Sequence, residues 1–104
     1  IADGKELTVV TFVSGELFRI DAKGKRHGLP KPPKGDLDGL LKLDDSRLIM
    51  SSWAGSALYV LNKDNTYSIL ADSLDAPADL GFDPKRQRVL IPLFKKNQLV
   101  FLPL

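Results

Sequence analysis

Two aspartates, Asp38 and Asp79, are the residues of this sequence best suited to chemistry, and they stand 41 positions apart. Carboxylates that converge from neighbouring elements bind hard divalent cations, and one carboxylate can take a proton from an attacking water. The other role for Asp38 is to cap a turn through backbone N–H groups, and both roles stay open. Asp79 could line the substrate pocket, but its structural role is favoured, because Leu80 follows it where Gly39 follows Asp38.

A set of aromatic residues shares the same spacing. Phe12, Trp53 and Phe94 are separated by 41 residues each. Trp53 and Phe94 could wall a substrate pocket, or all three could pack between repeated units. Lys95 directly follows Phe94 and could stabilise an anionic substrate, although loop lysines are usually solvated. His27 is the only histidine, which leaves a histidine-rich metal site and a serine triad unsupported.

The elements that must position these residues form an internal repeat. Shifting the chain by 41 positions aligns three segments without a gap, and each reads as a pair of strands rich in Val, Ile, Leu and aromatic residues. The aligned pairs are 6–12 with 16–21, 47–53 with 57–62, and 88–94 with 98–103. One complete period predicts four strands, over Gly39–Leu43, Arg47–Trp53, Ala57–Asn62 and Tyr67–Ala71, joined by short turns.

Four antiparallel strands in each period of this length are typical of the blades of a β-propeller. A β-sandwich of about ten strands is the main alternative, but it would not need a constant period. We therefore predict an all-β propeller with a partial blade over 1–35, a full blade over 36–76 and a partial last blade over 77–104.

The length limits this interpretation. A chain of 104 residues covers about two and a half such blades, whereas closed propellers have roughly four to eight. Apolar blade faces and unpaired edges left in water would invite aggregation. We expect the remaining blades of the same protein, or a second copy of the chain, to be its partner.

Composition excludes several other classes of protein. The net charge of +2 is too small to predict binding to nucleic acid or to an anionic membrane. No apolar run is long enough to predict a membrane span. The chain has no cysteine, so disulfides and thiolate chemistry are absent, and a periplasmic, secreted or cytoplasmic location is equally compatible. No phosphate-binding loop or dinucleotide fingerprint occurs, so no cofactor-binding residues are predicted.

Two segments resemble a known family. In the run 37–62, an Asp-Gly pair opens the inner strand, an acidic turn leads to an aliphatic second strand, and a glycine-containing hairpin leads to a third strand ending in Asn. This pattern is similar to a blade of the senescence marker protein/gluconolactonase (regucalcin-like) family of six-bladed propellers. The run 76–94 resembles the last blade of bacterial members. The likeness extends over roughly residues 3–104 and corresponds to the C-terminal half of such a protein.

The resemblance implies a metal-assisted hydrolase for a lactone or small ester. In that family the central channel holds a divalent cation (Ca, Zn, Mg or Mn) on a Glu, two Asn residues and the Asp of an Asp-Gly pair, which also acts as general base. Only Asp38 matches a ligand here, so it is the predicted catalytic and metal-binding residue, and the other ligands would belong to blades outside this chain. The alternative function is a non-catalytic propeller that binds a ligand or a protein, as NHL-like domains do.

Overall fold

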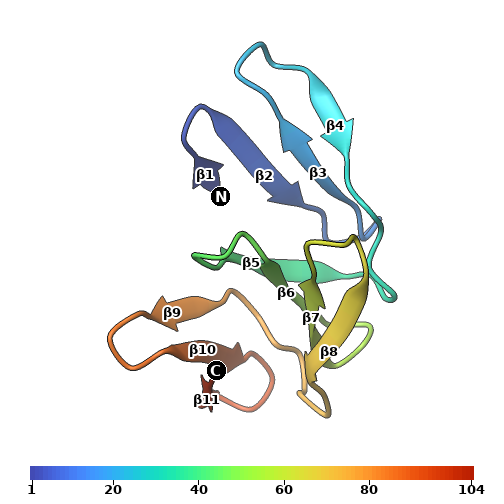
Figure 1. Cartoon of the computed structure of the whole chain (residues 1–104). Coiled ribbons are helices and arrows are strands. Elements are labelled where there is room, and N and C mark those ends of the chain that lie inside the picture. The colour runs from blue at the N-terminus through green and yellow to red at the C-terminus, as the bar shows by residue number, and fades with distance from the viewer.

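The computed structural model describes residues 1–104 and contains eleven strands and no helix. The strands form three antiparallel sheets, which Figure 1 shows fanned out one after another along the chain. Sheet 1 comprises β1 (Ala2–Asp3), β2 (Glu6–Val10), β3 (Leu17–Ile20) and β4 (Arg26–Gly28). Sheet 2 comprises β5 (Leu37–Lys42), β6 (Leu48–Ser52), β7 (Ala57–Leu61) and β8 (Tyr67–Ala71). Sheet 3 comprises β9 (Gly81–Asp83), β10 (Arg88–Leu93) and β11 (Gln98–Pro103).

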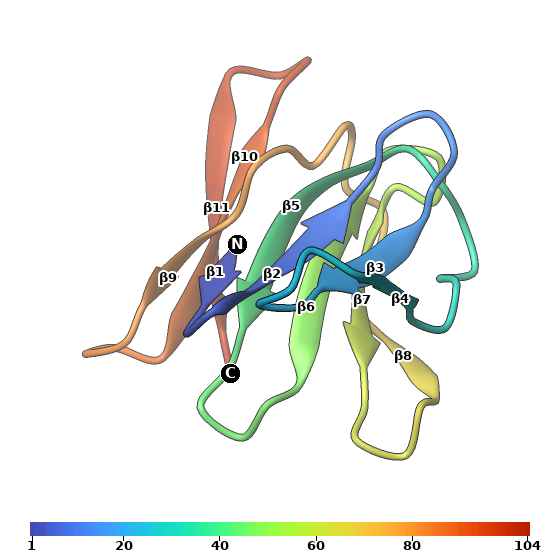
Figure 2. The same ribbon diagram turned by 90° about the horizontal axis from the view of Figure 1, so that it is seen from above.

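Each sheet is a meander in which strands pair in chain order, as propeller blades do. The predicted all-β fold of four-stranded antiparallel blades is thus confirmed. The strands predicted from the repeat recur within two residues of their expected ends, and the largest differences are at the start of β5 and at the end of β2, which the repeat extended to residue 12. The first strand of each sheet lies on one side of the fan, and β4 and β8 lie on the other (Figures 1 and 2). The chain contains no helix long and apolar enough to cross a membrane.

Two apolar clusters hold the sheets together, and both lie between sheets. The cluster between sheets 1 and 2 joins residues such as Leu17 and Met50. The cluster between sheets 2 and 3 joins residues such as Leu58 and Ile91. Every residue of β6 and β7 is buried, because sheet 2 is covered on both faces. This explains why the aliphatic residues of these strands follow one another without the alternation of a half-exposed sheet.

The outer faces of the fan have no sheet packed on them. Leu99 and Phe101 on sheet 3 are each 51% exposed, while their repeat equivalents Leu58 and Val60 are 0% and 4% exposed. On sheet 1, Leu7 is 47% exposed, and its equivalent Leu48 is 8% exposed. Both outer faces of the three-sheet array therefore expose apolar residues whose equivalents in sheet 2 are buried between sheets.

Candidate functional site

The two predicted aspartates are brought together. Asp38 lies in β5 and Asp79 lies just before β9, and both side chains are exposed. They line one hollow of about 270 Å³ whose wall is completed by sheet 1. The other five residues that line the hollow are mainly apolar: Ile1, Thr8, Val9, Val10 and Leu40. Because β5 and β9 are the first strands of their sheets, the hollow lies on the side of the fan where a propeller has its channel.

The backbone at Asp38 departs from regular pairing. The register of β5 against β6 shifts between Leu37 and Leu40, so Asp38 and Gly39 form a bulge. Bulges re-aim side chains and recur next to active sites. At the equivalent place in sheet 3, β9 pairs with β10 as far as Leu90, and pairing resumes only at the isolated bridge between Pro77 and Leu93. Pro92 has no N–H to continue that ladder, which leaves Asp79 outside the strand.

A buried serine fixes the bulge to the next sheet. The Ser51 hydroxyl accepts a hydrogen bond from the Gly39 N–H at 2.7 Å and donates one to the Ala78 carbonyl at 2.8 Å. Ser51 therefore makes the side-chain hydrogen bonds that join β5 to the segment before β9, and neither Asp38 nor Asp79 takes part in them. Sequence reasoning missed Ser51, although a polar residue inside the aliphatic strand 48–52 was the available signal.

Gly39 has a packing role of its own. A Cβ built on it would lie 2.5 Å from the Leu80 nitrogen and 2.7 Å from the Ala78 oxygen. The glycine of the Asp-Gly pair is therefore required for close approach of sheet 3. Leu80, which stands where a second glycine would complete the repeat, packs over Gly39.

The aromatic residues of the repeat meet in space. The ring centroids of Phe12 and Trp53 are 5.3 Å apart at an interplanar angle of 84°, and those of Trp53 and Phe94 are 5.4 Å apart at 35°. The three rings follow β2, β6 and β10, so they bridge all three sheets at one end of the strands. Phe94 remains 67% exposed and is followed by the exposed Lys95. These rings pack against one another across the sheets, one pair edge-to-face and the other tilted, as the packing alternative proposed, and they also present an apolar rim.

Trp53 lies at the same end of sheet 2 as Asp38. Leu37 pairs with Ser52, and the Trp53 N–H donates a hydrogen bond to the Asp36 carbonyl at 3.0 Å, so Trp53 lies beside Asp36, two residues before Asp38. The Trp53 Nε1 atom is buried and has no hydrogen-bond partner. A buried indole N–H normally finds an acceptor.

The chain alone does not form a complete metal centre. No group of three or more His, Cys, Asp or Glu side chains lies close enough together to hold a metal ion. Asp38 and Asp79 offer two carboxylates, whereas Ca²⁺ takes six to eight oxygen ligands and Mg²⁺ six. The residues present therefore fit part of a cation site, and further ligands would have to come from elsewhere.

Comparison with known proteins supports the propeller fold. No family model and no curated protein matches the sequence. Among solved structures, the virginiamycin B lyase from Staphylococcus aureus superposes with a TM-score of 0.68 at 14% identity, covering 100% of this chain. A streptogramin B lyase superposes with a TM-score of 0.57 at 14% identity, covering 93% of this chain. The chain spans only 40% and 39% of those two proteins.

The fold and these neighbours define the class: the chain consists of consecutive blades of a β-propeller. At this low identity the comparison establishes the fold alone. The particular gluconolactonase family predicted from the Asp-Gly blade pattern is not shown by it.

Proposed function

We propose that this chain supplies part of the active-site wall of a propeller enzyme that acts on a small molecule in the central channel. The observation that carries the proposal is the pairing of Asp38 and Asp79 on one hollow, from equivalent places in adjacent blades. The two solved propellers that it resembles are both described as lyases. This agrees with an enzymatic role at the level of a hydrolase or lyase acting on a small substrate.

We further propose hydrolysis of a lactone or small ester, with Asp38 as general base. An exposed carboxylate on a bulge can reach a water molecule held in the hollow and take its proton as the water attacks the carbonyl carbon. The aromatic rim of Trp53 and Phe94 would contact an apolar part of the substrate. Lys95, on the loop after Phe94, is suited to an anionic group at the mouth.

A divalent cation is part of this proposal through Asp38. Asp38 would give one oxygen ligand, with Asp79 near enough to the same hollow to contribute a second. When bound, such a cation would polarise the substrate carbonyl. Its remaining ligands would belong to other blades.

Those other blades form the partner that we propose. The exposed Leu99 and Phe101 occupy the places of the buried Leu58 and Val60, so another blade of the same repeat fits this face. The blade is supplied by the rest of a longer chain or by a second copy. The sedimentation mass of the chain in solution distinguishes the two: a dimer of the 11.5 kDa chain indicates a second copy.

The catalytic proposal is tested by hydrolysis of γ-butyrolactone and of p-nitrophenyl acetate by the chain in its closed assembly, with and without added Ca²⁺, Mg²⁺, Mn²⁺ or Zn²⁺. We expect Asp38→Asn to lower kcat by about 10²-fold or more, the usual contribution of a general base. Asp44→Asn is the matched control, because Asp44 is also exposed but lies in the turn at the far end of β5. Equal activity of the two variants would contradict the role of Asp38.

The same preparation tests the cation. Calorimetric titration should show that Asp38→Asn weakens cation binding, and unchanged affinity would remove Asp38 from the ligand set. If the assembly neither hydrolyses the two esters nor binds a cation, but still binds γ-butyrolactone, the non-catalytic binding propeller would be favoured instead.

A further inference from the structure

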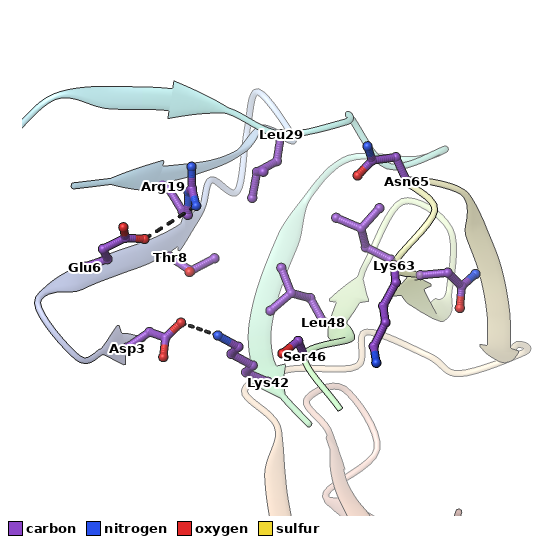
Figure 3. Close-up of a pocket in the computed structure, with 12 residues that line it drawn as sticks. Asp3, Glu6, Thr8, Arg19, Leu29, Lys42, Ser46, Leu48, Lys63 and Asn65 are labelled. Atoms are coloured by element: carbon purple, nitrogen blue, oxygen red, sulfur yellow. Dashed lines mark hydrogen bonds and ion pairs between the residues drawn. The ribbon is translucent and has the colours of Figure 1, made fainter. Parts of the chain in front are cut away.

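The roomiest cleft of the molecule is not at the aspartates. It has a volume of about 310 Å³ and lies between sheets 1 and 2, towards the ends of the strands opposite Asp38. Turn residues such as Ser46 and Lys63 form its rim. Figure 3 shows side chains of both sheets facing one another across it. Only Thr8 is shared with the hollow beneath Asp38.

The repeat shows that this cleft replaces part of a packed core. On sheet 2, Ile49 and Val60 face sheet 3 and are buried in the apolar cluster. The equivalent residues of sheet 1, which face sheet 2, are Thr8 and Arg19. Polar residues thus stand where the same fold elsewhere in the chain has aliphatic ones. A packed aliphatic junction is the more stable solution, so the substitution favours an open, polar-lined space over tight packing.

The charges in the cleft are distributed unevenly. Arg19 pairs with Glu6 at 3.6 Å, and Lys42 pairs with Asp3 (Figure 3). Lys63, on the other side of the cleft, forms no salt bridge, but its charge, after the hydrogen bonds from Arg47, helps to lower the pKa of the exposed Asp45 carboxyl. Three cationic and two anionic side chains line the cleft, so the lining carries a net charge of +1, which is suited to a single negative charge on a ligand.

Three of the twelve residues that line the cleft are hydrophobic, and the others are polar or charged. Leu29, Leu48 and Leu61 line the cleft, and Leu48 and Leu61 belong to the cluster between sheets 1 and 2. A cleft of this volume is at the small end of the range for small-molecule sites. We propose that it binds a small amphipathic monocarboxylate, with the carboxylate at Lys63 and the apolar part against Leu48 and Leu29.

The test is a titration of the isotopically labelled chain with sodium hexanoate, followed by amide chemical shifts, with hexanamide as the neutral control. We expect saturable shifts at the amides of Thr8, Arg19, Leu48 and Lys63 and weaker binding of hexanamide. Shifts that do not saturate or that scatter over the surface would overturn the proposal, and equal binding of both probes would overturn the role of the charge.

Two variants sharpen the result. Lys63→Gln should weaken hexanoate binding about two- to fivefold, which is the contribution of one solvent-accessible ion pair. The amide shifts of residues away from the cleft should stay unchanged. The double variant Thr8→Ile with Arg19→Val gives sheet 1 the aliphatic pair of sheet 2. It should lose the saturable shifts and unfold at no lower temperature than the parent chain. Retained hexanoate binding in a folded double variant would contradict the proposed site.

Discussion

Replacing Gly39 by alanine tests how tightly consecutive blades pack beneath the candidate site. The added Cβ would lie 2.5 Å from the Leu80 nitrogen and 2.7 Å from both the Ala78 oxygen and the Leu80 Cγ. Ordinary contacts of a Cβ are 3.4–4 Å, so sheet 3 must move away by close to an ångström. Two of the three clashing atoms are backbone, which a side-chain rotation cannot relieve.

The movement also strains the Ser51 bridge. Its two hydrogen bonds, of 2.7 and 2.8 Å, join the same two segments that the new methyl group would push apart. Overpacking costs about 1–3 kcal/mol, and a buried polar group left without its partner costs about 1–3 kcal/mol. If the sheets move apart, the overpacking is relieved but the Ser51 hydrogen bonds weaken, so the two costs are not both paid in full. We therefore expect Gly39→Ala to lower the free energy of unfolding by about 3 kcal/mol.

The assay is urea denaturation followed by the fluorescence of Trp53, the only tryptophan. Gly28→Ala is the matched control, because Gly28 also lies in a strand, and a Cβ on it would meet nothing within 4 Å. We expect the control to change stability by less than about 0.5 kcal/mol. Equal stability of the two variants would refute the close packing of sheets 2 and 3 at the Asp-Gly pair.

Three further predictions follow from individual contacts. Ser51→Ala leaves the Gly39 N–H and the Ala78 carbonyl without their partner, so the free energy of unfolding should fall by about 2–4 kcal/mol; a loss below about 0.5 kcal/mol in urea titrations would contradict the bridge. Leu58→Ala should lower the free energy of unfolding by about 3 kcal/mol, because Leu58 is fully buried. Leu99→Ala should lower it by under about 1 kcal/mol, because no blade covers Leu99. Equal losses in urea titrations would mean that the face around Leu99 is covered. Burial raises the pKa of Tyr67 to about 12, and its hydroxyl donates to the Pro30 carbonyl. Because the unfolded chain ionises first, near pH 10, the stabilisation is complete below that pH and is lost as the pH rises towards 12, and absorbance titration at 295 nm against Tyr67→Phe should show the late-ionising phenol.

The repeat made much of the fold predictable from the sequence. Turns and aliphatic strands recur at a fixed spacing, and local strand signals are strongest where both faces of a sheet are buried, as in β6 and β7. The inner strand of sheet 2 was predicted from Gly39 but begins at Leu37. The bulge at Asp38 hides the pairing of Leu37 with Ser52, because a shift of register breaks the alternation by which strands are recognised.

The site was less accessible to sequence reasoning. The spacing of Asp38 and Asp79 predicted that they occupy equivalent places, and the structure puts them on one hollow. The bridging role of Ser51 depends on a contact with the following sheet, at a separation of 27 residues from Ala78. The polar cleft between sheets 1 and 2 was also missed, because Thr8 and Arg19 become unusual only once their equivalents Ile49 and Val60 are known to be buried.

The juxtaposition of Asp38 and Asp79 is the claim on which the proposed function rests, and the absence of natural cysteine makes it directly measurable. The double variant Asp38→Cys with Asp79→Cys should be joined efficiently within one chain by a short bis-maleimide. The pair Asp44→Cys with Asp79→Cys, which has its first cysteine at the far end of β5, should not. Efficient internal cross-linking of the first pair alone is the predicted result. Cross-linking of the first pair no faster than of the second would contradict a common site.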